Sequence, residues 1–218
     1  RNLVTELDLE VERLVTGRIG ARYPDHGILA EEGARKEGAG GLRWVIDPLD
    51  GTKEFCAGRE DFTVNIALIE HGAPVAGLVY APARAVLYAG SGEVAYRASV
   101  ADASGEAVVE RRMPLKPESE PKPRRVVASR NHLTPETEDY LAGLKGCSTV
   151  NIGSSLKFCL LAEGSADLYP RFSRTMEWDT AAGQAIALSA GYSVVNANDQ
   201  SAVVYNKSEL LNPWFIVQ

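Results

Sequence analysis

Two aspartates with a spacing suited to metal chemistry stand in the block 47–52, directly after an apolar segment. Pro48 fixes its own backbone φ angle and blocks the strand ladder, and Gly51 permits a tight turn, so the carboxylates of Asp47 and Asp50 can converge. Converging carboxylates repel each other unless a proton or a cation lies between them. Because Mg²⁺ prefers such oxygen ligands, the block predicts a metal site, with an ordinary acidic surface turn as the alternative.

The residues after this block can begin a helix at Thr52. The backbone N–H groups of Gly51 and Thr52 would then point outward and offer an anion site. A metal-binding turn beside an anion-binding turn suits phosphate ester hydrolysis, because a metal polarises the phosphoryl oxygens and lowers the pKa of a bound water. The two features together predict a magnesium-dependent phosphomonoesterase.

Four other acidic residues could complete the site, although each also has an ordinary structural explanation. Asp8 lies on a predicted helix and could be a surface aspartate. Glu31 and Glu32 follow a short predicted strand and could belong to a solvated loop. Asp179 is predicted at the N-cap of a helix, where a carboxylate is favoured in any case.

The pattern of apolar residues predicts the elements that position these acids. Helices are expected over residues 3–20, after an N-cap at Thr134, and over 154–163 and 179–190. Strands are expected over residues 28–30, 43–47, 63–70, 74–83, 86–89, 93–97, 126–128 and 148–152. Residues 33–41 are Gly-rich and charged and predict a loop, and the prolines in 114–123 predict a linker.

Composition describes an ordinary globular chain of 218 residues, with 45% hydrophobic residues and a net charge of -6. Such an acidic surface argues against general binding of nucleic acid. No apolar run approaches the roughly 20 residues that span a bilayer. Cys56, Cys147 and Cys159 lack metal-type spacing and indicate reduced thiols in a cytoplasmic protein, with a position at the periphery of the inner membrane as an alternative. The first residue is Arg1, so a missing N-terminal segment is expected.

In combination these motifs resemble the inositol monophosphatase superfamily of Mg²⁺-dependent, lithium-sensitive phosphatases. The matching segments, in the family's order, are 3–8, 28–32, 44–52 and 178–183, which read LVTELD, ILAEE, WVIDPLDGT and WDTAAG. The resemblance implies an α/β fold, an αβαβα sandwich with mixed, largely antiparallel sheets. It also implies an N-terminal lobe over 1–118, which carries most metal ligands, and a C-terminal lobe over 119–218.

The resemblance implies a role for each acid, with two to three Mg²⁺ ions as cofactors. Glu31, Asp47 and the Leu49 carbonyl would hold one ion, and Asp47, Asp50 and Asp179 would hold the second. Asp8 and Thr52 would orient and deprotonate the attacking water near a third, weaker ion, and Glu32 would support the ligands. Ala30 replaces the family's usual glycine, which removes no ligand.

The C-terminal half is more similar to the 3'(2'),5'-bisphosphate nucleotidases, which remove the 3'-phosphate of adenosine 3',5'-bisphosphate. The segments that carry this likeness are 129–132, 153–158, 162–171, 205–207 and 211–213. The metals and the N–H groups of Gly51 and Thr52 would bind one phosphate, with Asp179 facing the substrate. Lys157 and Arg171 would bind the other phosphate. Ser154 would add a hydrogen-bond donor, and His132 would contact the nucleotide.

Two other readings remain open for the sequence. Residues 23–29 are closer to the inositol phosphatases, so inositol monophosphate or fructose 1,6-bisphosphate is an alternative substrate. A catalytically inactive phosphate or metal sensor is the second, although the full ligand set is present. In-line attack by water is expected, because the chain lacks a Cys-x5-Arg loop for a covalent phosphoenzyme. The partner is a small phosphate ester, bound by a monomer or a homodimer.

Overall fold

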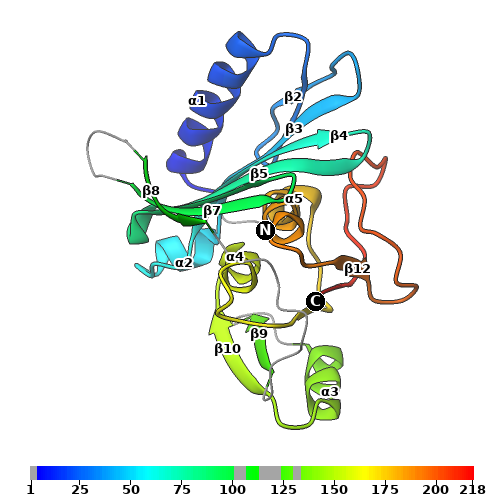
Figure 1. The fold of residues 1–218 in the computed structure, drawn as a ribbon. Helices are drawn as coiled ribbons and strands as arrows, with labels where there is room; N and C mark the ends of the chain where they lie inside the picture. The colour runs from blue at the N-terminus through cyan, green and yellow to red at the C-terminus, as the bar shows by residue number, and fades with distance from the viewer. Residues whose placement is uncertain (1–3, 101–106, 113–123, 130–133) are drawn as a thin grey trace.

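The computed structural model describes residues 4–100, 107–112, 124–129 and 134–218, and it is built around one eight-stranded sheet (Figure 1). The strand order is β2-β1-β3-β4-β5-β6-β7-β8. Only β1 and β3 pair in parallel, and the other neighbours are antiparallel. The strands are β1 Gly27–Ala30, β2 Arg35–Lys36, β3 Leu42–Asp50, β4 Thr63–Glu70, β5 Ala73–Ala81, β6 Val86–Ser91, β7 Val94–Val100 and β8 Ala107–Arg112.

Two helices cover opposite faces of this sheet (Figure 1). Helix α1, Glu6–Arg22, packs on β1 and β3, and helix α5, Glu177–Ser189, packs on β3 to β7. Strand β4 explains the division, because its residues alternate between buried positions that face α5 and half-buried positions on the other side. The main apolar core therefore lies between the sheet and α5.

Helix α5 approaches the sheet closely because glycines stand beneath it. A Cβ atom on Gly77 would lie 2.3 Å from the carbonyl oxygen of Ala182, and one on Gly90 would lie 2.8 Å from the Cα of Ile186. Such distances are far below normal packing contacts, so only glycine fits at these positions. The close contact brings the first turn of α5 toward the end of β3.

The remaining described elements form two smaller sheets and three short helices. Strands β9, Arg125–Ser129, and β10, Ser148–Ile152, pair in parallel. An antiparallel sheet of order β11-β13-β12 joins Tyr169–Arg171, Phe215–Val217 and Val194–Asn196. The helices are α2 Thr52–Cys56, α3 Pro135–Gly143 and α4 Leu156–Ala162, with a 3-10 turn at Pro82–Arg84. No helix in the described ranges has the length and apolarity to cross a membrane.

The predicted layered α/β class and the largely antiparallel sheet are confirmed. The strands at 63–70 and 148–152 have the predicted bounds, and α3 begins after the predicted N-cap at Thr134. The short strands β8, β11, β12 and β13 were not predicted, and β2 lies within the expected loop. The linker at 114–123 and the lobe boundary at 118 fall outside the described residues, so the division into lobes stays a prediction.

Candidate active site

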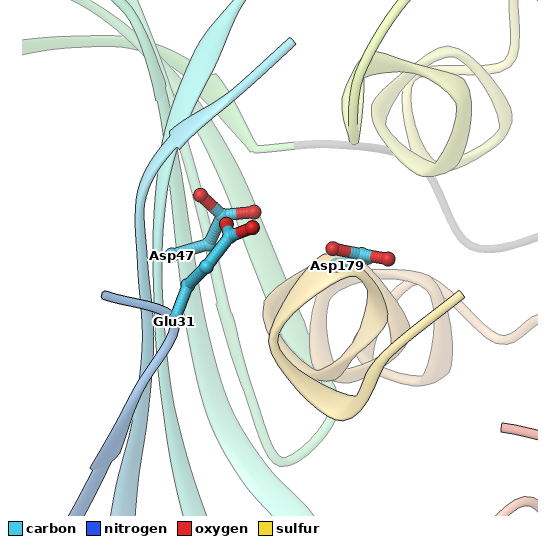
Figure 2. A group of neighbouring side chains, drawn as sticks. All are labelled: Glu31, Asp47 and Asp179. Carbon is cyan, nitrogen blue, oxygen red and sulfur yellow. The ribbon is translucent and has the colours of Figure 1, made fainter. Parts of the chain in front are cut away.

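Three carboxylates from three separate elements meet at the edge of the main sheet (Figure 2). Glu31 follows β1, Asp47 lies on β3 and Asp179 lies in the first turn of α5. One oxygen of each lies within 4.8 Å of the others. In Figure 2 the side chains of Glu31 and Asp47 lie together on the sheet side, and Asp179 faces them from the helix. The structure thus assembles acids that are far apart in the sequence.

Asp47 tests whether this cluster suits a cation. Its side chain is only 1% exposed, and Oδ1 accepts a hydrogen bond from Leu49 N at 3.0 Å. Its Oδ2 is buried and accepts no hydrogen bond from any described residue. A buried carboxylate oxygen without a donor is costly, and a hard cation held by the neighbouring oxygens would satisfy it. The donor set therefore fits Mg²⁺.

The acids shift each other's pKa values in the direction expected for a cluster without its cation. Burial raises the pKa of Asp47 well above its ordinary value, and the charges of Asp50 and Glu31 add to this. The pKa of Glu31 rises to about 7 through burial and then through the charge of Asp179. Burial, followed by the charge of Asp50, raises the pKa of Asp179 to about 7. A divalent cation would favour the ionised forms instead.

The start of α5 fixes Asp179 differently from the prediction. Helix α5 begins at Glu177 with Met176 as N-cap, so Asp179 is the third helical residue and the expected N-cap role is wrong. Its Oδ2 accepts a hydrogen bond from Met176 N at 2.7 Å, which satisfies one of the free N–H groups of the first turn. A carboxylate at this place also benefits from the helix dipole.

Asp50 is held by a pair of buried polar residues that the sequence analysis missed. Ser155 Oγ lies 2.9 Å from Asp50 Oδ2 and 2.8 Å from the backbone oxygen of Asp179. Asn65 Nδ2 donates to Ser155 Oγ at 2.9 Å and lies 3.4 Å from Asp50 Oδ2. Ser155 therefore connects the sheet to α5. It stands inside a segment that the sequence analysis matched, 153–158, but nothing in its type marked this contact.

The turn after β3 brings Thr52 to Asp8. The pairing of β3 with β4 shifts register between Asp47 and Asp50. Strand β3 therefore continues past Pro48 to Asp50, whereas the sequence predicted that it would end at Asp47. Thr52 Oγ1 lies 3.1 Å from the Leu49 carbonyl oxygen and 3.5 Å from Asp8 Oδ1. Asp8 is 1% exposed, which excludes the surface alternative. The Thr52 hydroxyl therefore connects the Asp8 carboxylate of α1 to the turn that carries Asp47 and Asp50.

A cavity of about 640 Å³ opens beside these groups and carries charges of both signs. Most of the residues predicted for the site line it, namely Glu31, Asp50, Gly51, Thr52, Ser154, Lys157, Arg171 and Asp179. Asp8, Asp47 and Leu49 do not line the cavity, and they lie behind its wall. His132 falls outside the described residues, so its predicted contact stays a prediction.

Two cations, Lys157 and Arg171, line the same cavity as the acids. Lys157 is 5% exposed, and its Nζ donates to the Ser154 carbonyl oxygen at 2.6 Å. Burial, followed by the charge of Arg171, lowers the pKa of Lys157 to about 8. Arg171 Nε is buried and has no hydrogen-bond partner among the described residues, while its Nη2 donates weakly to the Arg174 oxygen at 3.4 Å. These cations can bind an anionic group that enters the cavity.

Comparison with known proteins decides the family. The sequence profile of the inositol monophosphatase family matches residues 1–215 of this chain. The chain belongs to the inositol monophosphatase family. Family members depend on Mg²⁺, and the acidic cluster around Asp47 is consistent with that requirement.

Relatives within the family include the 3'(2'),5'-bisphosphate nucleotidase CysQ of Escherichia coli K12. The two sequences are 40% identical over 217 residues, which cover 98% of this chain and 84% of that protein. The CysQ protein of Salmonella typhimurium is 41% identical over 220 residues, again 98% of this chain and 84% of the relative.

Solved structures of family members have the same fold. The crystal structure of CysQ from Bacteroides thetaiotaomicron superposes with a TM-score of 0.83 at 42% identity, covering 97% of this chain and 82% of that one. Inositol monophosphatase II from Staphylococcus aureus gives a TM-score of 0.79 at 25% identity, covering 96% and 75%. The inositol-monophosphatase-like fold predicted from the sequence is confirmed.

Proposed function

We propose that this chain is a Mg²⁺-dependent 3'(2'),5'-bisphosphate nucleotidase, which hydrolyses the 3'-phosphate of adenosine 3',5'-bisphosphate to give AMP and phosphate. One observation carries the proposal, because a single cavity is lined both by acids that can hold metal ions and by the cations Lys157 and Arg171. The 40% identity to a CysQ protein over 98% of the chain supports the same substrate class.

The acids divide into two ligand groups in this proposal. Glu31, Asp47 and the Leu49 carbonyl would hold one Mg²⁺ ion, and Asp47, Asp50 and Asp179 would hold another, with a third, weaker ion near Asp8. Support comes from the buried Oδ2 of Asp47, which has no hydrogen-bond partner among the described residues, and from the short distances within the cluster. Bound Mg²⁺ neutralises phosphoryl charge and makes water a better nucleophile.

Asp8 and Thr52 handle the proton of the attacking water. Thr52 Oγ1 can donate to Asp8 and accept from a water, which orients one lone pair of that water toward the phosphorus. Asp8 also accepts from Thr5 N at 2.9 Å and from the Thr5 hydroxyl, so its carboxylate is fixed in place. Gly51 and Thr52 line the same cavity, where their backbone N–H groups would stabilise the phosphoryl oxygens.

Lys157 and Arg171 select the substrate by binding its second phosphate. The pKa of Lys157 is lowered because this ammonium is buried beside another cation, so a phosphate dianion relieves an existing cost. Arg171 Nε contributes a donor that no described residue uses. Ser154 lines the cavity next to Lys157 and adds a hydroxyl donor. An inositol monophosphate lacks the second phosphate and gains nothing from these cations.

A phosphate-release assay distinguishes the substrates. Adenosine 3',5'-bisphosphate and inositol 1-phosphate are compared at equal concentration, with Mg²⁺ and with added Li⁺. The proposal expects a large preference for the nucleotide, and a large preference for the inositol ester overturns the substrate assignment. Absence of hydrolysis with every ester, despite Mg²⁺ binding, would restore the sensor alternative.

A cytoplasmic location and a state as monomer or homodimer belong to the same proposal. The comparisons do not support the alternative at the periphery of the membrane, which is not carried forward. Sedimentation of the purified protein with and without Mg²⁺ measures the oligomeric state directly, and a mass above that of a dimer contradicts the expectation.

A further inference from the structure

Helix α1 carries a second buried carboxylate, Glu12, one helical turn after Asp8. Residues four apart lie on the same face of a helix, so both side chains point toward the sheet. Glu12 is 6% exposed. Asp8 reaches Thr52, whereas Glu12 reaches the turn that follows β1. A buried carboxylate beside an acidic cluster is unfavourable on electrostatic grounds, so its presence needs a specific contact to offset the cost.

That contact is a pair of hydrogen bonds from the backbone of the turn that follows Glu31. Glu12 Oε2 accepts a hydrogen bond from Glu32 N at 2.7 Å, and Oε1 accepts one from Ala34 N at 2.9 Å. On the other side of the turn, Glu31 N donates to the Ile46 carbonyl oxygen of β3 at 3.2 Å. The backbone on both sides of the Glu31 side chain is therefore anchored, once by the sheet and twice by Glu12.

The geometry requires a carboxylate in particular. Two backbone N–H groups need two acceptor oxygens, and an ionised carboxylate offers acceptors only. A glutamine would offer one oxygen and turn its NH₂ group toward the other N–H. The turn contains Gly33 with φ +124°, and a backbone hydrogen bond from Ala30 N to the Ala34 carbonyl oxygen closes it at 2.9 Å. The two bonds to Glu12 add the contacts that tie this turn to α1.

We propose that Glu12 is a positioning residue that fixes the Glu31 ligand for metal binding by accepting the Glu32 and Ala34 N–H groups. It touches neither metal nor substrate and acts through the backbone of the turn. The inference rests on the proposed role of Glu31 as a metal ligand. Groups that hold metal ligands in place commonly change metal affinity by about 10- to 100-fold when removed.

The test is Glu12→Gln, compared with Glu10→Gln, which removes the same charge from an exposed position on the same helix. Calorimetric titration of the substrate-free enzyme with MgCl₂ should show a dissociation constant about 10- to 100-fold higher in E12Q and unchanged in E10Q. At saturating Mg²⁺, E12Q should recover turnover to within about threefold of wild type, because every ligand is still present. Amide exchange at Glu32 and Ala34 should accelerate in E12Q alone.

A folded E12Q that binds Mg²⁺ with wild-type affinity overturns the proposal. If E12Q does not fold, Glu12→Asp carries the test, since its carboxylate is one methylene closer to the helix and cannot reach both N–H groups. E12D should then bind Mg²⁺ more weakly than wild type, and wild-type affinity again overturns the proposal. Wild-type enzyme that binds no Mg²⁺ would instead contradict the proposed function, so the two failures are distinguishable.

Discussion

The two walls of the active-site cavity are built in opposite ways. The acid wall consists of Glu31, Asp50 and Asp179, together with the buried Asp47, which does not itself line the cavity. Burial raises the pKa values of Glu31, Asp47 and Asp179, whereas in the cation wall, Lys157 and Arg171, burial lowers the pKa of the lysine. Each wall is unfavourable by itself, because buried like charges repel. Metal ions offset the first and an anionic group offsets the second. The residues of the site therefore favour a cation at the acid wall and an anion at the cation wall.

The largest effect is expected from Asp47→Asn on the acid wall. Activity should fall by at least about 10³-fold, because Asp47 is shared by both proposed metal sites. Without metal the variant should melt at a higher temperature than wild type, since one buried charge is gone. Phosphate release and thermal melts in EDTA measure both. Turnover close to wild type would refute the metal assignment.

Lys157→Met on the cation wall should act on one substrate only. Its kcat/KM for adenosine 3',5'-bisphosphate should fall about 10- to 100-fold, which is the effect expected when one hydrogen bond to a charged group is lost. For adenosine 3'-monophosphate, which lacks the second phosphate, kcat/KM should change little. Lys145→Met, at an exposed lysine, is the matched control. If kcat/KM fell equally for both nucleotides, Lys157 would contribute to the hydrolysis step and not to substrate selection.

Ser155→Ala tests how Asp50 and Asp179 of the acid wall are held together. The hydroxyl touches the Asp50 carboxylate and the Asp179 backbone oxygen, so its loss should reduce activity by about 3- to 10-fold and weaken Mg²⁺ binding. Ser148→Ala, at an exposed serine of β10, should have no effect. The Mg²⁺ dependence of phosphate release measures the change. If S155A keeps both values, the acid wall is held by the sheet and α5 alone.

The smallest effect concerns stability and pH. In metal-free enzyme, Glu31 and Asp179 have pKa values near 7, above their ordinary values near 4, so the folded state binds more protons over that interval. Their favourable contribution is complete at low pH and is lost as the pH rises toward and through 7. Melting temperatures in EDTA should therefore fall by several degrees from pH 5 to pH 8. Saturating Mg²⁺ should abolish this fall, and a flat profile in EDTA would contradict it.

The sequence predicted elements well where local pattern decides the structure. Strand β4 alternates strictly, and its bounds at Thr63 and Glu70 were predicted correctly. Strands β11 and β13 are three residues each, and they form because Tyr169 pairs with Val217. The local sequence pattern cannot predict a contact between residues so far apart in the chain. Asp179 was assigned to the N-cap, but aspartate is favoured both at that position and at the third helical position. The helix begins two residues earlier than predicted, and Asp179 accepts a hydrogen bond from the N–H group of the N-cap residue Met176.

The residues of the site were likewise predicted where a local motif marks them and were missed where only tertiary contacts do. The acids could be listed from their motifs, but that Ser155 lies against both Asp50 and Asp179 depends on tertiary packing. A lone serine has too many possible partners for its type to indicate one. The same holds for Glu12, which reads as one polar residue among others on an amphipathic helix until its contacts to Glu32 and Ala34 are known.

The close contact of α5 with Gly77 and Gly90 has a consequence for synthesis of the protein. The sheet and the acids Glu31 and Asp47 leave the ribosome well before Asp179, which stands 132 residues after Asp47 (179 − 47). Until α5 docks on those glycines, the nascent chain presents an apolar sheet face and an incomplete set of ligands. The full set of proposed ligands is assembled only once α5 has docked, so tight Mg²⁺ binding is expected only of chains whose core is closed.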